Sequence, residues 1–319
     1  MASAALTFRL SRHIRVWPWV LAMTAVTVLG WEAFVGVALC DIAFHIPAAA
    51  RTVPPIERAE QLARTYHALL RPAAIPAFDG TPLRAWLYEP VHGNGSAVLL
   101  LHGMADSRTG AMGYAPLFLK HGYAVLSPDS RAHGASGGAI ATYGALERRD
   151  VHSWIDWLYT NHPPQRLYGL GESMGGSILL QSLAVEPRFR AVAVESAFSS
   201  LREIGYDRIA QHFHINLFFK RLLFWPAMDA ASIYAQAHYG VDLDSVSALP
   251  AVAASATPVL LIHGQQDDNV VADHSDEIEA ANPSHVALWR PERAGHAAAL
   301  GTCPELFEQK IIAWFEQHR

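Results

Sequence analysis

Cysteine is scarce in this sequence of 319 residues, which contains only two. Cys40 lies inside an apolar run and Cys303 near the C-terminus, so they have neither the number of a disulfide framework nor the spacing of a zinc site. The chain also lacks a His-Glu-x-x-His motif despite its 17 histidines; His212 and His214 merely stand close together in an aromatic stretch. We therefore expect no metal and no other cofactor, and cysteine usage indicates no redox compartment.

Blocks of basic residues are missing as well. The formal net charge is −5, and acidic and basic residues are interspersed along the chain. Proteins that bind nucleic acid carry a basic patch, so this class is excluded. Hydrophobic residues make up 51% of the chain, which excludes disorder for most of its length and allows a large buried core.

A long apolar run is present near the N-terminus, from Val16 to Leu39. About 20 apolar residues in a helix cross the hydrocarbon core of a bilayer. Arg9, Arg12 and Arg15 precede the run, and such a positive flank predicts a cytoplasmic N-terminus with the rest of the chain translocated. We therefore expect residues 1–50 to form a cytoplasmic stub and a transmembrane signal anchor, with the catalytic domain on the extracytoplasmic side of a membrane.

Three other interpretations of this run stay open. A cleaved signal peptide would give a secreted or periplasmic protein, but the candidate cleavage site Ala48-Ala49-Ala50 lies well beyond the run. A lipoprotein signal ending at Cys40 is disfavoured by the bulky Leu39 before it. A buried helix of a soluble domain is disfavoured by three tryptophans, which suit membrane interfaces, whereas Glu32 would be costly in lipid.

The pattern beyond residue 50 predicts a linker and short helix at residues 51–73, followed by one domain at residues 74–319. Short apolar strands alternate there with helical stretches, which is typical of a mostly parallel sheet covered by helices on both faces. About eight strands are expected, at residues 75–78, 83–88, 97–101, 124–127, 167–170, 191–195, 259–262 and 286–289; Asp79-Gly80 favours a hairpin between the first two. Residues 199–256 interrupt the alternation and are rich in apolar residues, which predicts an inserted helical cap.

One serine has a context that favours chemistry, in the segment Gly171-Glu172-Ser173-Met174-Gly175. A serine hydroxyl is a poor nucleophile unless it is exposed, hydrogen-bonded to a base and close to donors that stabilise an oxyanion. The segment stands between a predicted strand and a predicted helix at residues 174–186. A sharp strand-to-helix turn exposes its central side chain and tolerates only small residues two positions away, which the two glycines supply. An ordinary helix N-cap would need no such glycines.

This segment and four others in the same order resemble the α/β-hydrolase fold family. The others are residues 99–104 (LLLHGM), 128–137 (PDSRAHGASG), 260–270 (LLIHGQQDDNV) and 294–296 (AGH). The resemblance covers roughly residues 74–319 and implies the α/β-hydrolase fold. In residues 128–137 the chain departs from the family pattern, because Ala132 stands where glycine is usual.

The resemblance also implies the site residues. The nucleophile would be Ser173, the base His296 and the acid Asp267, and the order Ser, Asp, His along the chain is the one expected of this fold. The backbone N–H groups of Met104 and Met174 would form the oxyanion hole.

Other residues compete for two of these roles. Asp268 is adjacent to Asp267, and Glu195 ends a predicted strand where some relatives place the acid. His102 and His263 stand in His-Gly pairs and compete for the role of base, although such pairs suit turn geometry better.

Together these features predict a serine hydrolase that cleaves carboxylic esters with an apolar acyl or alcohol part through an acyl-enzyme on Ser173. Its partners would be a small, lipid-like ester and the membrane. A peptidase or thioesterase would use the same triad, because the triad sets acyl transfer but not the leaving group. A hypothesis from another class is a catalytically inactive, membrane-tethered binding protein, which would be expected to lack part of the triad or of the oxyanion loop.

Overall fold

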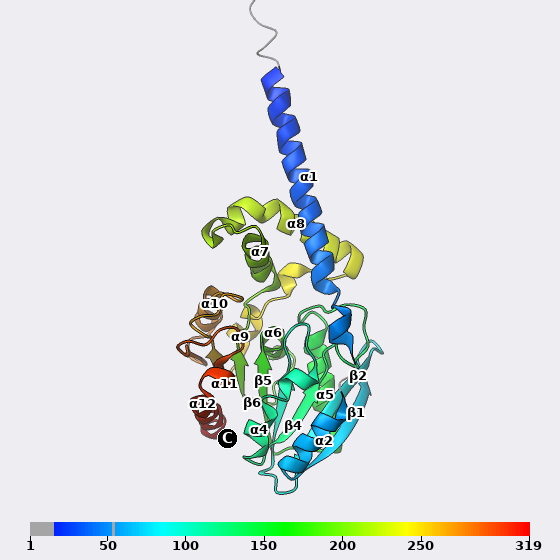
Figure 1. Cartoon of the computed structure of the whole chain (residues 1–319), viewed down its shortest axis with the longest axis vertical. Helices are drawn as coiled ribbons and strands as arrows, with labels where there is room; N and C mark the ends of the chain where they lie inside the picture. The colour runs from blue at the N-terminus through cyan, green and yellow to red at the C-terminus, as the bar shows by residue number, and fades with distance from the viewer. Residues whose placement is uncertain (1–15, 53–54) are drawn as a thin grey trace, which may run out of the picture.

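A computed structural model describes residues 16–52 and 55–319 of the chain. The three arginines before the apolar run lie outside the described residues. Figure 1 shows a long helix that extends from an α/β domain and passes a pair of cap helices on its way.

An eight-stranded sheet with the order β1-β2-β4-β3-β5-β6-β7-β8 forms the centre of the domain. β1 pairs antiparallel with β2 and β2 antiparallel with β4, and all the other pairs are parallel. The strands are β1 (Ala68–Pro76), β2 (Pro82–Pro90), β3 (Ser96–Leu101), β4 (Ala124–Pro128), β5 (Arg166–Glu172), β6 (Phe189–Glu195), β7 (Val259–Ile262) and β8 (Val286–Trp289). The expected sheet, its hairpin at one edge and its eight strands are thereby confirmed.

Helices cover both faces of the sheet, as a parallel sheet requires. Alternate residues of β3 belong to different cores, with Leu99 and Leu101 in one and Val98 and Leu100 in the other. The first core is completed by α5 (Glu147–Asn161), α6 (Met174–Ser182), α9 (Leu249–Ala254) and α10 (Asp273–Ala281). The second is completed by α2 (Ile56–Thr65), α3 (Arg108–Ala111), α4 (Ala115–Leu119), α11 (Ala299–Thr302) and α12 (Pro304–Gln317).

The cap is a helical insertion between β6 and β7, as expected. It consists of α7 (Leu201–His212), η3 (Leu217–Phe219), α8 (Lys220–Tyr239) and η4 (Leu243–Ser245). The following helix, α9, packs against α6 and α10 of the domain and so leads the chain back to the sheet.

The apolar run forms α1 (Val16–Phe44), which is longer than the predicted 16–39. It is long and apolar enough to span a membrane, a property that signal sequences and some core helices share. Its residues 16–31 are exposed, whereas Gly36, Cys40 and Phe44 are buried. α1 packs against α8, which crosses it (Figure 1). η2 (Ala48–Arg51) follows α1 in the chain.

β1 begins at Ala68, before residue 74, where the sequence pattern predicts the start of the domain. The reason is that β1 is an edge strand whose first residues are mostly exposed, so they carry no apolar alternation. Pro72 within it is tolerated because an edge strand leaves one side of its backbone unpaired. Pairing with β2 along its whole length, and not its own pattern, makes this segment a strand.

Candidate active site

Ser173 lies at a strained turn between the end of β5 and the start of α6. Its backbone has φ 48° and ψ −117°, a conformation that costs energy for any residue with a side chain. The N–H of Ser173 donates to the carbonyl of Glu195 over 2.8 Å, which ties the turn to β6. A Cβ on Gly171 would lie 2.6 Å from the carbonyl oxygen of Gly175, so the predicted need for glycine at this position has a direct cause. The turn presents the hydroxyl of Ser173 to the space above the sheet.

Ser173, His296 and Asp267 are joined by hydrogen bonds. His296 Nε2 lies 2.9 Å from Ser173 Oγ, and His296 Nδ1 lies 3.1 Å and 3.0 Å from the two carboxylate oxygens of Asp267. Burial alone would raise the pKa of Asp267, but hydrogen bonds from His296 and the Val270 N–H outweigh it, and the pKa lies below its usual value. An ionised Asp267 keeps the imidazole proton on Nδ1, so Nε2 is free to accept the serine proton.

The competing acids lie elsewhere. Asp268 is exposed, whereas Asp267 is buried beside the imidazole of His296. The carboxyl group of Glu195 lies 2.9 Å from the Tyr114 hydroxyl and accepts a hydrogen bond from the Ala299 N–H. Of the candidate acids, it is therefore Asp267 that the structure brings to His296.

Both competing histidines, His102 and His263, use their ring nitrogens in hydrogen bonds that stabilise loops. His263 bonds the Val270 carbonyl over 2.9 Å and the Ser275 hydroxyl over 2.6 Å. His102 Nε2 accepts from the Ser130 N–H over 3.0 Å, so its Nδ1 donates to the adjacent carbonyl of Gly103 over 2.7 Å. Burial lowers the pKa of both rings, which keeps them neutral and suited to these bonds.

Met104, Met174 and Ser173 line the same cavity. Neither the Met104 nor the Met174 backbone N–H donates to another group within residues 16–52 and 55–319, so both are available to a ligand oxygen. The loop that carries Met104 is held by His133, whose Nε2 accepts from the Ala105 N–H over 3.3 Å. Burial lowers the pKa of His133 to about 4, so its ring stays neutral and can accept this bond.

A buried hydrogen-bond network that the sequence analysis missed lies behind this turn. Glu172 accepts from the Gly103 N–H over 3.2 Å and from the Tyr114 hydroxyl over 2.9 Å, and the same hydroxyl lies 2.9 Å from Glu195. Glu195 in turn accepts from the Ala299 N–H over 2.7 Å, close to His296. The network therefore joins the loops that carry Met104, Ser173 and His296. Only the place of both glutamates at strand ends could have indicated it.

The protonation of this network follows from counting hydrogens. A phenol has one proton and cannot donate to two carboxylates at once, so one carboxyl group must donate to Tyr114. Burial raises the pKa of both Glu172 and Glu195, and that of Glu195 to about 7, so the pair retains a proton up to pH values near neutral.

We predict that Glu195→Gln raises the melting temperature much more at pH 8 than at pH 5. Because the pKa of Glu195 is raised in the folded state to about 7, its contribution to stability is present at low pH. The contribution is lost as pH rises from the unfolded value of about 4.3 through the folded one. Glutamine imitates the protonated acid and removes this loss. Thermal unfolding between pH 4.5 and 8.5 checks it, with exposed Glu292→Gln as the control; parallel curves for wild type and Glu195→Gln would contradict it.

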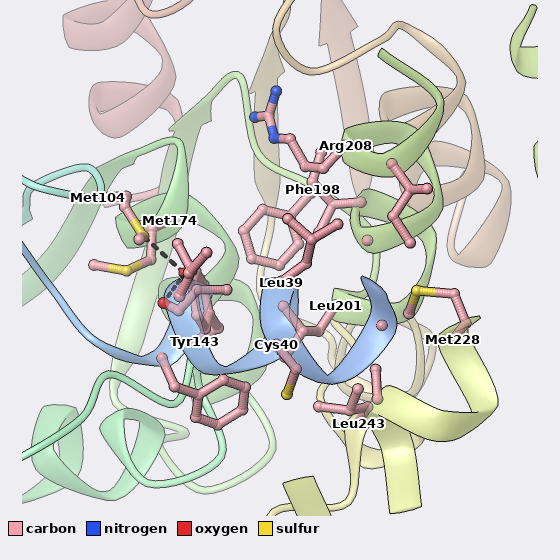
Figure 2. Close-up of a pocket in the computed structure, with 18 of the residues that line it drawn as sticks. Leu39, Cys40, Met104, Tyr143, Met174, Phe198, Leu201, Arg208, Met228 and Leu243 are labelled. Carbon is pink, nitrogen blue, oxygen red and sulfur yellow. Dashed lines mark hydrogen bonds between the residues drawn. The ribbon is translucent and has the colours of Figure 1, made fainter. Parts of the chain in front are cut away.

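Ser173 lines a mostly apolar cavity of about 430 Å³, which we call the Ser173 pocket. Figure 2 shows this cavity, with Arg208 among the labelled residues that line it. Its walls come from the loop that carries Met104, Phe198, the cap helices α7 and α8, and the end of α1. No aspartate or glutamate of the described residues lines it. Nor do three His, Cys, Asp or Glu side chains meet anywhere in the described ranges in a way that could hold a metal ion.

The sheet order, the turn that carries Ser173 after β5 and the cap between β6 and β7 are those of the α/β-hydrolase fold. Residues 94–235 match the family described as serine aminopeptidase, S33. This match supports a hydrolase of the esterase or peptidase type.

Individual proteins similar to this chain come from bacteria and an archaeon. The uncharacterized protein YqkD of Bacillus subtilis is 26% identical over 227 residues, which cover 70% of this chain and 72% of that protein. The Pyrococcus furiosus esterase Pf2001 has a similar structure, with a TM-score of 0.69, 22% identity and coverage of 86% of this chain and 98% of that one. A puromycin-hydrolyzing peptidase of Mycobacterium tuberculosis has a TM-score of 0.57 and 19% identity, covering 72% of this chain and 36% of the other. The two structures share the fold with this chain.

Proposed function

We propose that this protein is a serine hydrolase that cleaves carboxylic esters with an apolar acyl or alcohol part. The observation that carries the proposal is the hydrogen-bonded chain from Ser173 through His296 to Asp267, which opens into an apolar pocket. A nucleophile, a base and an orienting acid in this arrangement are what acyl transfer requires.

In the proposed mechanism, Ser173 Oγ attacks the ester carbonyl carbon while His296 Nε2 takes its proton. The negative charge that forms on the carbonyl oxygen accepts hydrogen bonds from the Met104 and Met174 N–H groups. His296 then gives its proton to the departing alkoxide, which leaves as the alcohol. The acyl group stays bonded to Ser173 Oγ. A water molecule repeats the sequence and releases the acid. Asp267 orients the imidazole and stabilises its cationic form throughout.

The lining of the Ser173 pocket supports an ester over an aminopeptidase substrate. Recognition of a free α-amino group needs a nearby anion, and no aspartate or glutamate of the described residues lines the pocket. A cavity of about 430 Å³ whose walls are mostly apolar, with Arg208 and His45 as polar exceptions, suits an acyl chain instead.

A peptidase is the second candidate, because the family matched by residues 94–235 is named for serine aminopeptidases. A thioesterase would use the same triad. Matched ester, thioester and aminoacyl-amide substrates, assayed side by side on the purified protein, distinguish the three. We expect the apolar ester to have the highest kcat/KM, and a clear preference for the aminoacyl amide would contradict the ester proposal.

We predict that Ser173→Ala lowers kcat for such an ester by about 10⁴-fold or more, because the acyl-enzyme cannot form. Steady-state hydrolysis of a p-nitrophenyl ester measures the loss. Ser153→Ala is the control, since its hydroxyl bonds the Arg149 carbonyl within α5 and Ser153 does not line the Ser173 pocket. Comparable activity in wild type and Ser173→Ala would show that Ser173 is not the nucleophile. If neither protein hydrolysed any of the substrates, the catalytically inactive binding protein would be the better account.

We also propose that α1 anchors the protein in a membrane with the catalytic domain on the extracytoplasmic side. The exposed apolar surface of residues 16–31 supports the anchor, and the arginines at the start of the sequence support the orientation. Protease added to intact cells or spheroplasts should digest the domain. Full protection of the domain in spheroplasts would contradict this orientation and indicate a cytoplasmic domain.

A further inference from the structure

The C-terminal turns of α1 lie against the Ser173 pocket. Five residues of this part of the helix share one face, because they are spaced three and four apart: Gly36, Leu39, Cys40, Ala43 and Phe44. All five line the pocket that also contains Ser173. Figure 2 shows Leu39 and Cys40 on α1, drawn in blue, beside Leu201 of the cap and Phe198 of the domain. The helix proposed as a membrane anchor thus also bounds the cavity in front of the serine.

Hydrogen bonds fix the end of α1 to the hydrolase domain. The Tyr143 hydroxyl donates to the Ala43 carbonyl over 2.6 Å and also lies 2.8 Å from Met104 Sδ. The Ala141 N–H donates to the Phe44 carbonyl over 3.0 Å. Through Tyr143, the position of α1 is therefore coupled to that of the loop with the proposed oxyanion donor.

Contacts with the cap fix the other side of the helix. Phe44 stacks on Tyr239 of α8 with 5.0 Å between ring centroids, and Asp41 accepts from the hydroxyls of Tyr234 and Tyr239. Higher up, Gly36 lies so close to Ala227 of α8 that a Cβ on Gly36 would overlap the Ala227 carbonyl. Small residues at such a crossing let two helices approach closely. The end of α1 is thus packed between the domain and the cap.

Removal of α1 would leave the Ser173 pocket without this wall. Phe44 is only 1% exposed and Cys40 7% exposed, and both belong to the same core as Phe198 and Leu201. Without the helix, apolar surface of the cap and domain would face water at a cost of roughly 25 cal/mol per Å². A domain cut after residue 50 would therefore lack a part of its own substrate site.

We propose that the C-terminal turns of α1 form the acyl-chain wall of the substrate site, with Leu39 as a specificity-determining residue. The helix is accordingly retained in the active protein and is not removed as a signal peptide. This inference rests on the proposed function, since it describes how the same site accepts its ester. The substrate class it defines is an ester whose acyl chain extends from Ser173 along α1.

Two substitutions of Leu39 in the full-length, detergent-solubilised protein test the wall. Leu39→Trp fills the pocket and should lower kcat/KM for a dodecanoyl ester by about tenfold or more, with the acetyl ester changed by no more than about twofold. Leu39→Ala enlarges the pocket and should shift the preferred acyl chain to a greater length. The readout is kcat/KM across p-nitrophenyl esters from acetyl to hexadecanoyl.

Leu29 provides the matched controls, because it lies on the same helix, is 46% exposed and does not line the pocket. Leu29→Trp and Leu29→Ala should keep the wild-type chain-length profile. A purely structural role of Leu39 would lower kcat/KM for all esters alike and would not shift the two variants in opposite directions. If a Leu39 variant fails to unfold cooperatively on heating, Leu39→Phe or Leu39→Val takes its place.

Wild-type chain-length profiles in both Leu39 variants would contradict the proposal that α1 forms the acyl-chain wall. So would N-terminal sequencing of active protein from cells that places its first residue after residue 50. Failure of the proposed function looks different, because Ser173→Ala would then keep its activity whatever the Leu39 variants do. Labelling of the Leu39 variants by a small fluorophosphonate should stay at the wild-type level, which shows that the serine remains reactive while the chain-length profile changes.

Discussion

Replacing His296 by glutamine is expected to lower kcat for ester hydrolysis by about 10⁴-fold. Glutamine can still bond the Ser173 hydroxyl but has no basic nitrogen to accept its proton. The hydrogen bonds of 2.9 Å to Ser173 and 3.0 Å to Asp267 place the imidazole between nucleophile and acid, so no neighbouring group takes over its role. Steady-state hydrolysis of a p-nitrophenyl ester measures the change, and the thermal unfolding midpoint should stay close to that of wild type.

The matched control is His92→Gln, since His92 is an exposed histidine outside the Ser173 pocket. The double variant Ser173→Ala/His296→Gln should be no slower than either single variant, because the two residues act as one unit. If the two losses instead multiplied, Ser173 and His296 would contribute to catalysis independently, contrary to the proposed mechanism.

The second large effect concerns stability. Arg131→Ala is expected to lower the free energy of unfolding by about 3–5 kcal/mol, because it leaves a buried carboxylate without its partner. Arg131 is 3% exposed and bonds both carboxylate oxygens of Asp150, at 2.7 Å and 2.6 Å, and one of Asp79 at 2.8 Å. Burial already raises the pKa of Asp150 to about 6 despite this partner.

Denaturant unfolding at pH 8 measures this loss, since there Asp150 must remain ionised or take up a proton at a cost. Arg190→Ala on the surface of β6 is the control and should change the stability by no more than about 0.5 kcal/mol. Arg131→Ala/Asp150→Ala should recover part of the loss, as it removes the unpaired charge as well. If Arg131→Ala lowered the free energy of unfolding by less than about 1 kcal/mol, the ion pair with Asp150 would not stabilise the loop that carries Arg131.

The parts of the fold and site that follow from short segments could be predicted from the sequence. Continuous apolar strands predicted β3 and β7 to within a residue, because a strand buried on both faces has no alternation to obscure it. Ser173, Asp267 and His296 each stand in a local motif at the end of a strand, and the parallel sheet brings such ends to one edge.

Features that depend on packing between distant segments could not be predicted. The network of Glu172, Tyr114 and Glu195 joins three separate segments. The sequence around each of these residues does not indicate which residue it bonds. Similarly, the apolar pattern of α1 is the same whether it faces lipid or a pocket, so Leu39 carries no sign of the role proposed for it.

Ala132 lies between these two cases. Its departure from the family's glycine is visible in the sequence, but its cost is visible only in the structure, where Ala132 is buried with φ 62°. Glycine adopts such a backbone without strain, which accounts for the family's preference at this position.

Mapping of a covalent adduct tests the central proposal most directly. Wild-type protein is treated with a fluorophosphonate and digested, and the modified residue is located by tandem mass spectrometry. The proposed mechanism predicts one stoichiometric adduct on Ser173, no adduct in Ser173→Ala, and much slower labelling in His296→Gln, because only an activated serine reacts at neutral pH. An adduct on another residue, or equal labelling of wild type and Ser173→Ala, would contradict it.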